Sequence, residues 1–221
     1  MQLEEKLKEY YRKSYKFVSG NSDIYTAANV NLNVGGTQGT LGINSQIAAT
    51  LAYFSAVNLL DKLGNGVTYA DLCRDQILKG KRILDLGSGS RSYFARTVVP
   101  MGAHVTSIDL AEYEDYGPVK IAIGNGECRE DREIMSNNHQ RIVGDLNLSP
   151  TLDELRPMDY DMITSSYFII FRTSSSETLP LSKEWWENLH TKLKIDGLSF
   201  HDEDFPNSTE LGLGESFWIK R

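Results

Sequence analysis

Residues 83–90, with the sequence ILDLGSGS, carry the residue types best suited to holding a polar ligand. The short apolar run is typical of a buried strand, and Gly87 and Gly89 follow it where the chain must turn. Glycines there adopt positive φ and let a ligand approach the main chain without a Cβ in the way. Gly87, Ser88, Gly89 and Ser90 are therefore predicted to bind a ligand, although a plain strand-to-helix turn also fits two glycines alone.

Three kinds of cofactor use such turns. A nucleoside triphosphate loop needs GxxxxGK[ST], and no lysine follows these glycines. A dinucleotide fingerprint needs a third glycine where this chain has Ser92, and the nearby carboxylate of Asp85 disfavours a pyrophosphate. An acid there instead suits a ligand with positive charge at the turn, and S-adenosylmethionine (SAM) carries a sulfonium and an α-ammonium group. Asp85 is therefore a predicted SAM-binding residue, and an NAD(P)-binding oxidoreductase is the alternative.

Residues 83–90 resemble motif I of the class I SAM-dependent methyltransferases, an acid followed by GxGxG. The resemblance extends more weakly over residues 81–221, and it departs from the pattern at Arg91, which takes the place of the last glycine. It implies a SAM-dependent methyltransferase with a Rossmann-like fold. A catalytically silent methyltransferase-like binding domain is a further alternative.

The resemblance also implies which residues contact the nucleoside of SAM. In the family, an acid that ends the second strand binds both ribose hydroxyls, and a polar residue after the third strand reaches the adenine amino group. Here "HVTSIDL" offers Asp109, followed by Leu110, and "RIVGDL" offers Asp145, followed by Leu146. Both acids also suit helix N-caps. Ser165, which ends the fourth apolar run, completes the predicted cofactor site.

The acceptor site of the family lies above the carboxyl ends of the fourth and fifth strands. The fourth run ends in "TSSYFII" and lacks the (D/N)PPY of methyltransferases that act on adenine or glutamine amino groups. The fifth ends in "FHDEDF", where carboxylates beside His201 are expected to raise its pKa and make it a general base. A solvated acidic loop is the competing interpretation. We expect methyl transfer to an oxygen or nitrogen atom of a small molecule, without a metal.

Short apolar runs alternate with helical or loop segments along the chain, and this alternation indicates an α/β fold. We expect a Rossmann-like three-layer sandwich with a mostly parallel central sheet and an N-terminal helical cap. Apolar runs that predict strands are "RILDLG", "AHVTSIDL", "RIVGDL", "YDMITSS", "GLSFHDE" and "SFWIK". Residues 4–17, the run from Ser45, and "TYADLCRDQILKG" predict helices before them. The expected domains are a cap or lid over residues 1–80 and a SAM-binding core over 81–221.

Three further segments complete this interpretation. Residues 21–44, rich in Asn, Gly and Thr, predict a loop. Residues 111–140 predict a decorated crossover. In "SKEWWENLHTKLKIDG", Trp185, Leu189 and Leu193 recur at helical spacing and predict one packed helix.

Composition and charge limit which partners and which cellular compartment we expect. The 221 residues are 40% hydrophobic, with a net charge of −7 and no dense Lys/Arg run, so we expect no nucleic-acid partner. Cys73 and Cys128 form no CxxC pair, which favours a reducing compartment. No secretory signal and no run of 18 apolar residues is present, so we expect a cytoplasmic protein without a membrane partner. A small-molecule substrate is the expected partner, and a homodimer is compatible with the sequence.

Overall fold

The computed structural model describes residues 3–21, 24, 37–54, 66–115, 117–124, 127–146, 149–165, 183–201 and 217–221. Its helices are α1 (Leu3–Ser19), α3 (Thr37–Phe54), α5 (Tyr69–Arg74), α6 (Tyr93–Val98), the 3-10 helix η1 (Val99–Met101), α7 (Glu133–Asn138), α8 (Ser149–Asp153) and α9 (Lys183–Thr191). Its strands are β1 (Arg82–Leu86), β2 (His104–Asp109), β3 (Val119–Gly124), β4 (Glu127–Asp131), β5 (His139–Val143), β6 (Tyr160–Ser165), β7 (Leu193–His201) and β8 (Phe217–Ile219).

The main sheet has six described strands in the order β5-β2-β1-β6-β7-β8. Neighbouring strands run parallel except β8, which is antiparallel to β7. From β1 the chain builds outward through β2 and β5, and it then returns to β1's other side with β6. The strand order therefore reverses at β1, and parallel sheets bind ligands at the carboxyl end of such a reversal. The predicted Rossmann-like α/β fold is confirmed.

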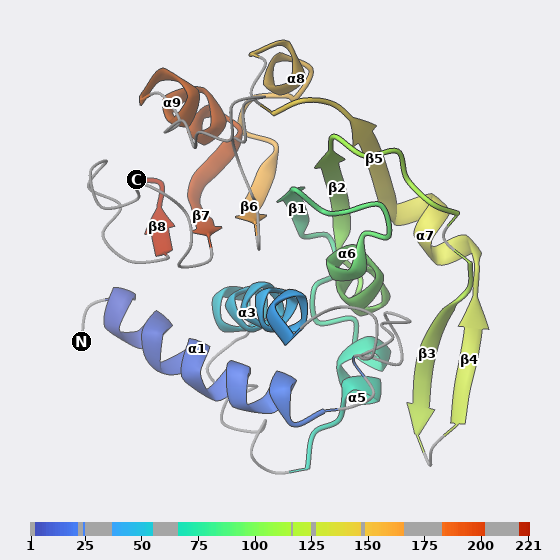
Figure 1. Ribbon diagram of the computed structural model, residues 1–221. Coiled ribbons are helices and arrows are strands. Elements are labelled where there is room, and N and C mark those ends of the chain that lie inside the picture. The colour runs from blue at the N-terminus through green and yellow to red at the C-terminus, as the bar shows by residue number, and fades with distance from the viewer. Residues whose placement is uncertain are drawn as a thin grey trace.

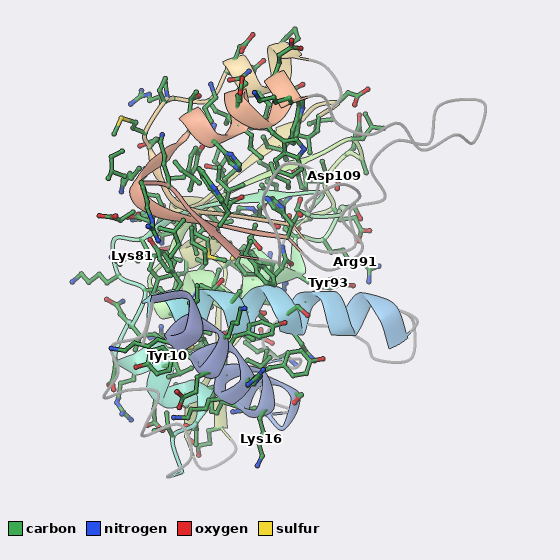
Figure 2. All side chains as sticks on the ribbon, turned by 90° about the vertical axis from the view of Figure 1, so that its left-hand side faces the viewer. Tyr10, Lys16, Lys81, Arg91, Tyr93 and Asp109 are labelled. Atoms are coloured by element: carbon green, nitrogen blue, oxygen red, sulfur yellow. The ribbon has the colours of Figure 1, made fainter. Side chains whose placement is uncertain are left out.

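Helices cover both faces of this sheet (Figure 1). Helices α3 and α1 lie on one side, with α3 nearer the sheet, and α8 and α9 lie on the other, as Figure 2 shows from the side. In β1 the side chains alternate: Ile83 joins the core beneath α3 and α6, whereas Leu84 and Leu86 join the core beneath α8 and α9. Buried apolar side chains on both faces explain why this strand reads as a continuous apolar run.

The N-terminal helices share the core of the sheet. Ile47 and Leu51 of α3 are fully buried in the same cluster as Ile83 of β1 and Phe200 of β7. The ring centroids of Tyr11, in α1, and Phe200 are 5.8 Å apart. The division at residue 80 stays a prediction.

The crossover predicted over residues 111–140 contains a second, two-stranded sheet. Strands β3 and β4 pair antiparallel and lie apart from the main sheet (Figure 1). Helix α7 follows them and leads into β5.

Two expected boundaries were wrong. Helix α3 begins at Thr37, so residues 37–44 are helical rather than part of a loop. Helix α9 ends at Thr191, and Leu193 is the first residue of β7 rather than the last apolar position of the helix. The capping box predicted for α5 is confirmed by the hydrogen bonds between Thr68 and Asp71. The sequence predicts that the helix from Ser45 continues to a stop at Gly64, and residues 55–64 of that prediction lie outside the described residues.

None of the described helices is long and apolar enough to cross a membrane.

Candidate cofactor site

The glycine loop leaves the carboxyl end of β1 with its backbone in the left-handed region. Gly87 has φ 69° and Gly89 has φ 68°, and the Gly87 amide donates a hydrogen bond of 2.8 Å to the Ile108 carbonyl at the end of β2. In the part of the chain that the structure describes, a Cβ built on Gly89 would meet no atom within 4 Å apart from its chain neighbours. The turn therefore requires glycine for its conformation rather than for packing against the described residues.

Asp109, the last residue of β2, binds the glycine loop directly. Its Oδ2 accepts a hydrogen bond of 2.8 Å from the Gly89 amide, and its Oδ1 accepts one of 2.8 Å from the Ala111 amide. Residues 110–115 form no helix, so Asp109 is not a helix N-cap. A carboxylate has about four acceptor sites, which leaves room for a vicinal diol. Leu110 beside it is 70% exposed.

Residues 110–115, which we call the strap, run alongside the glycine loop. The Tyr113 hydroxyl donates its proton over 3.3 Å to the Ile142 carbonyl in β5, and it accepts a hydrogen bond of 3.2 Å from Ser88 Oγ. Tyr113 thus links the loop after β1 with the end of β5. Burial is the main cause that raises the pKa of Tyr113, so its hydroxyl is neutral at physiological pH.

Glu114 fastens the strap to the loop a second time. Its side chain accepts hydrogen bonds of 2.9 Å from Ser90 Oγ and 2.8 Å from Arg91 Nε, and its amide donates one of 3.0 Å to the Ser90 carbonyl. The hydrogen bonds from Ser90 and Arg91 lower the pKa of Glu114. Arg91, the departure from the methyltransferase pattern, therefore pairs with Glu114. Figure 2 shows Arg91 and Asp109 on the same side of the molecule, at the opposite end of the sheet from Lys81.

Tyr113 and Glu114 were not among the predicted site residues. They lie in a polar segment without periodicity, so only the contacts of the fold reveal them. The only feature of the sequence that could have indicated Tyr113 and Glu114 as site residues is their position shortly after Asp109.

Asp85 is buried on the face of β1 that packs against α3. Its side chain accepts hydrogen bonds of 2.9 Å from Gln46 Nε2 and 3.4 Å from Ser107 Oγ, and the residue is 1% exposed. Burial raises the pKa of Asp85 to about 7, and the like charge of Asp109 adds to this effect. A cation next to Asp85 would favour its ionised form.

Asp145 and Leu146 follow β5 as expected. Asp145 is half-buried and its carbonyl accepts a hydrogen bond of 2.7 Å from Thr151 Oγ1. Helix α8 begins at Ser149, so Asp145 is not its N-cap. Leu146 is buried in the core beneath α8 and α9, and its carbonyl accepts a hydrogen bond of 2.6 Å from Trp185 Nε1. Their contact with a nucleobase stays a prediction.

His201, the predicted general base, lies at the carboxyl end of β7 and is buried. Its Nδ1 is 2.7 Å from Ser165 Oγ, and its Nε2 is 2.7 Å from Ser199 Oγ. The Trp186 and His201 rings form a T-shaped pair, with centroids 5.1 Å apart. Ser165, predicted to contact the cofactor, is thus a partner of His201.

The expected rise in the pKa of His201 was wrong. Burial, together with the nearby His190, lowers the pKa of His201 to about 3. The imidazole is therefore held neutral by removal from water. The acidic residues 202–204, on which the expectation rested, lie outside the described residues.

Buried neutral histidines should make the fold sensitive to acid. Burial lowers the pKa of His139 to about 3 and of His190 to about 4, as for His201. The unfolded chain binds more protons at these histidines below their ordinary pKa of 6.5, so stability falls as the pH drops through 6.5. Asp85 has the opposite effect on stability. Its raised pKa lets the folded state bind an extra proton between about pH 4 and 7, so it offsets part of the loss caused by the histidines. We expect the free energy of unfolding to fall by about 3 kcal/mol from pH 7 to pH 5.

Urea unfolding at the two pH values measures this difference. His201→Gln should remove about 2 kcal/mol of it, more than half of the net difference, and His104→Gln, at an exposed histidine, is the matched control. Equal free energies of unfolding at pH 7 and pH 5 would contradict the assignment of neutral buried imidazoles.

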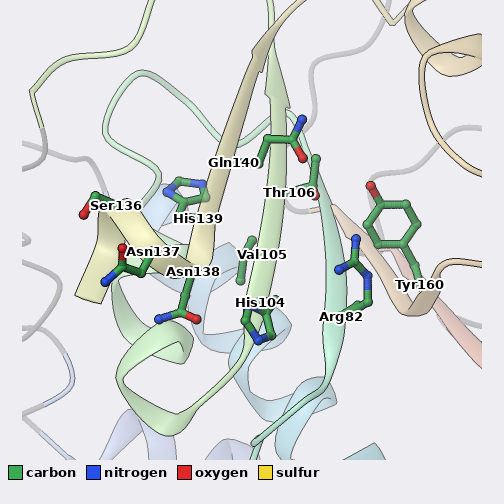
Figure 3. A pocket seen from close by; sticks show the side chains of 10 residues that line it. All are labelled: Arg82, His104, Val105, Thr106, Ser136, Asn137, Asn138, His139, Gln140 and Tyr160. Carbon is green, nitrogen blue, oxygen red and sulfur yellow. The ribbon is translucent and has the colours of Figure 1, made fainter. Parts of the chain in front are cut away.

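A polar pocket of about 240 Å³ lies at the opposite edge of the sheet (Figure 3). Its lining includes Arg82, His104, His139 and Tyr160, which are the first residues of β1, β2, β5 and β6. Because the strands are parallel, this pocket marks their amino ends, whereas the glycine loop marks their carboxyl ends. It is therefore separate from the candidate cofactor site.

The fold and the loop together define a Rossmann-like α/β protein with a glycine turn at the reversal of its strand order. No family model and no curated protein matches the sequence. Among solved structures, the chain is similar to proteins described as SAM-dependent methyltransferases, the family that the motif resembles.

One is a putative methyltransferase of this kind from Methanococcus maripaludis, with 12% identity and a TM-score of 0.36, over 66% of this chain and 59% of that one. A second is 1,6-didemethyltoxoflavin-N1-methyltransferase from Burkholderia thailandensis, with 13% identity and a TM-score of 0.37, over 60% and 49% of the two chains. A third is a TehB-like SAM-dependent methyltransferase from Corynebacterium glutamicum, with 19% identity and a TM-score of 0.32, over 65% and 67%. The chain matches about half to three fifths of the length of the first two.

Proposed function

We propose that this protein binds SAM at the glycine loop and transfers its methyl group to an oxygen or nitrogen atom of a small molecule. One observation carries the proposal: Asp85, the Gly87–Gly89 turn and Asp109 come together at the carboxyl edge where the strand order reverses. The side chains at this edge fit the chemistry of SAM. Two acidic side chains suit a cationic ligand with a ribose diol, and no described residue beyond the chain neighbours comes within 4 Å of a Cβ built on Gly89.

Each residue has a distinct task in this proposal. Asp109 accepts hydrogen bonds from the ribose hydroxyls while it holds the Gly89 amide. Asp85 supplies negative charge beneath the loop. When bound, SAM supplies an electrophilic methyl group on a sulfonium. The protein then needs to align the acceptor with that methyl group, because displacement at carbon requires no covalent bond to the enzyme.

Leu110, Asp145, Leu146 and Ser165 stay in the proposal as further contacts of the nucleoside. His201 stays a predicted general base. Its two ring nitrogens face serine hydroxyls, so its test is a comparison of turnover between the parent protein and His201→Gln at neutral pH. A cytoplasmic location stays a prediction.

Isothermal titration calorimetry tests the cofactor. We expect SAM and S-adenosylhomocysteine to bind with a Kd in the micromolar range, about −8 kcal/mol, and NADH to give no saturable heat. Mass spectrometry of the purified protein for bound S-adenosylhomocysteine is an independent check. Absence of saturation by SAM at hundreds of micromolar, or saturable binding of NADH instead, would reject the proposal.

A further inference from the structure

An exposed ion pair joins the end of the glycine loop to the strap. Arg91 Nε donates to Glu114 Oε2 over 2.8 Å, and the two side chains are 49% and 52% exposed. Ser90 Oγ donates to the other carboxylate oxygen, Oε1, over 2.9 Å, and Arg91 Nη1 donates to the Tyr93 hydroxyl over 3.1 Å. The neighbouring side chains thus fix the orientation of the pair, while about half of each partner stays accessible.

Both partners keep hydrogen-bonding capacity for a ligand. A guanidinium carries five N–H donors, and the described contacts use two of those of Arg91. A carboxylate has about four acceptor sites, and Ser90 and Arg91 occupy two of those of Glu114. The pair can therefore bind one anionic and one cationic group of a ligand side by side.

The charges around the loop decide which ligand group each partner suits. Arg91 is the only lysine or arginine among residues 86–93 and 109–115, whereas four of these residues are acidic. Arg141 also reaches the strap, but its Nη1 donates to the Glu114 carbonyl over 2.6 Å, so it holds the backbone of the strap from β5. Within these two segments, Arg91 is therefore the cationic partner for a ligand carboxylate, and Glu114 beside it suits an ammonium group.

The pair lies close to the contact that marks the proposed ribose site. Asp109 accepts a hydrogen bond from the Gly89 amide, and Arg91 follows Gly89 by two residues. Two residues of chain span at most about 7 Å. The thioether chain between the ribose and the α-carbon of SAM has a similar reach, so a cofactor whose ribose binds Asp109 can place its amino-acid end at the pair.

We propose that Arg91 and Glu114 bind the zwitterionic amino-acid end of the cofactor, with Arg91 on its carboxylate and Glu114 on its ammonium group. The inference rests on the proposed function, because it takes SAM as the cofactor. It assigns recognition of the amino-acid end to side chains, at a position where the methyltransferase pattern has a glycine. Charge-assisted hydrogen bonds are about twice as strong as neutral ones, so the pair selects ligands that carry both charges.

A purely structural role of the pair predicts a different result. If Arg91 and Glu114 only fasten the strap to the glycine loop, their loss weakens every ligand of the loop by the same factor. If they bind the amino-acid end, the loss is confined to ligands that carry this end. Ligands that differ only at the amino-acid end therefore separate the two roles.

Calorimetric titration with S-adenosylhomocysteine and with methylthioadenosine, which lacks the amino-acid end, makes this comparison. We expect the parent protein to bind S-adenosylhomocysteine about 30-fold more tightly or better, since two charge-assisted contacts are added. Arg91→Ala should reduce this preference by about tenfold and leave the Kd of methylthioadenosine within about twofold. An unchanged preference in Arg91→Ala, or an equal loss for both ligands, would overturn the proposal.

The matched control for Arg91→Ala is Arg129→Ala. Arg129 is an exposed arginine that pairs with Asp131 over 3.4 Å in β4, and β4 belongs to the two-stranded sheet outside the main sheet. Arg129→Ala should therefore keep the full preference for S-adenosylhomocysteine.

Two analogues of S-adenosylhomocysteine, one without the carboxylate and one without the amino group, assign the two contacts. Arg91→Ala should lose the preference over the decarboxylated analogue. Glu114→Gln, which can still accept hydrogen bonds from Ser90 and Arg91, should lose the preference over the deaminated analogue. Glu187→Gln is its control, because it removes an exposed carboxylate from an ion pair with Lys183 in α9. Loss of neither preference, or the reverse pattern, would overturn the proposal.

The parent protein separates failure of this inference from failure of the proposed function. Equal affinity for S-adenosylhomocysteine and methylthioadenosine would overturn the inference and leave a nucleoside site at the glycine loop. Binding of neither ligand at hundreds of micromolar would reject the proposed function and the inference with it. Either Arg91→Ala or Glu114→Gln decides between the two roles of the pair if the other variant fails to fold.

Discussion

Gly89→Val is expected to raise the Kd for SAM at least 100-fold while the protein stays folded. Among the described residues, and apart from the two chain neighbours, a Cβ at this position meets no atom within 4 Å, so we expect the valine side chain to extend into the space above the loop. That space is where the proposed cofactor approaches the main chain. A 100-fold loss corresponds to about 2.7 kcal/mol.

The backbone strain of this variant needs a matched control. Gly89 has φ 68°, where a β-branched residue is disfavoured. Gly80 has φ 75° and equally open surroundings, and it precedes β1 at the opposite edge of the sheet. Gly80→Val should therefore lose similar stability in thermal unfolding but keep full affinity for SAM. Comparable affinity in the two variants would show that the loop does not hold the cofactor.

Asp109→Ala is expected to weaken SAM binding by roughly 30-fold to 1000-fold, which corresponds to about 2–4 kcal/mol. Two charge-assisted hydrogen bonds to the ribose would be lost. The same substitution frees the Gly89 and Ala111 amides, so the glycine loop also loses its anchor. Calorimetric titration of the variant with SAM measures the combined effect.

Asp131 offers a control with the same structural task. Its Oδ1 accepts hydrogen bonds of 3.0 Å from the amides of Glu133 and Ile134 at the start of α7. Asp131→Ala removes two backbone contacts far from the glycine loop, so it should lower the melting temperature without changing the Kd. If Asp109→Ala weakens binding less than tenfold, Asp109 only supports the loop, and another residue must hold the sugar.

The strands and their terminal acids could be predicted because the signals are local. An apolar run of four or five residues, then Asp or Gly, identified β1 and β2 with Asp109 at the correct end. Parallel strands bring such ends to one edge, so their proximity followed from the fold class. The start of helix α3 was predicted too late in the chain, because residues 37–44 carry glycines and polar residues that disfavour helix in isolation. Packing of its later turns against the sheet overrides that preference.

The environments of the side chains could not be predicted in the same way. The neighbours of His201 along the chain are acidic, but its neighbours in space are Ser165, Ser199 and Trp186. Burial therefore determined the protonation state of His201. The acidic neighbours along the chain had suggested a raised pKa, whereas the pKa is lowered. Glu114 likewise meets Arg91 only because the strap folds back on the loop. Long-range contacts of this kind follow from the complete fold.

The joint core of α1, α3 and β7 has a consequence for how the protein acquires its structure during synthesis. The Tyr11 ring packs on Phe200, and the Tyr53 hydroxyl donates to the Asp196 carbonyl across 143 residues of chain. The first helices therefore leave the ribosome long before the strand that covers them exists. The apolar faces of these helices stay exposed to water, or bound to a chaperone, until β7 has been translated. Contacts of such high sequence separation favour slow, late folding, so the risk of aggregation is concentrated in the nascent chain rather than in the finished protein.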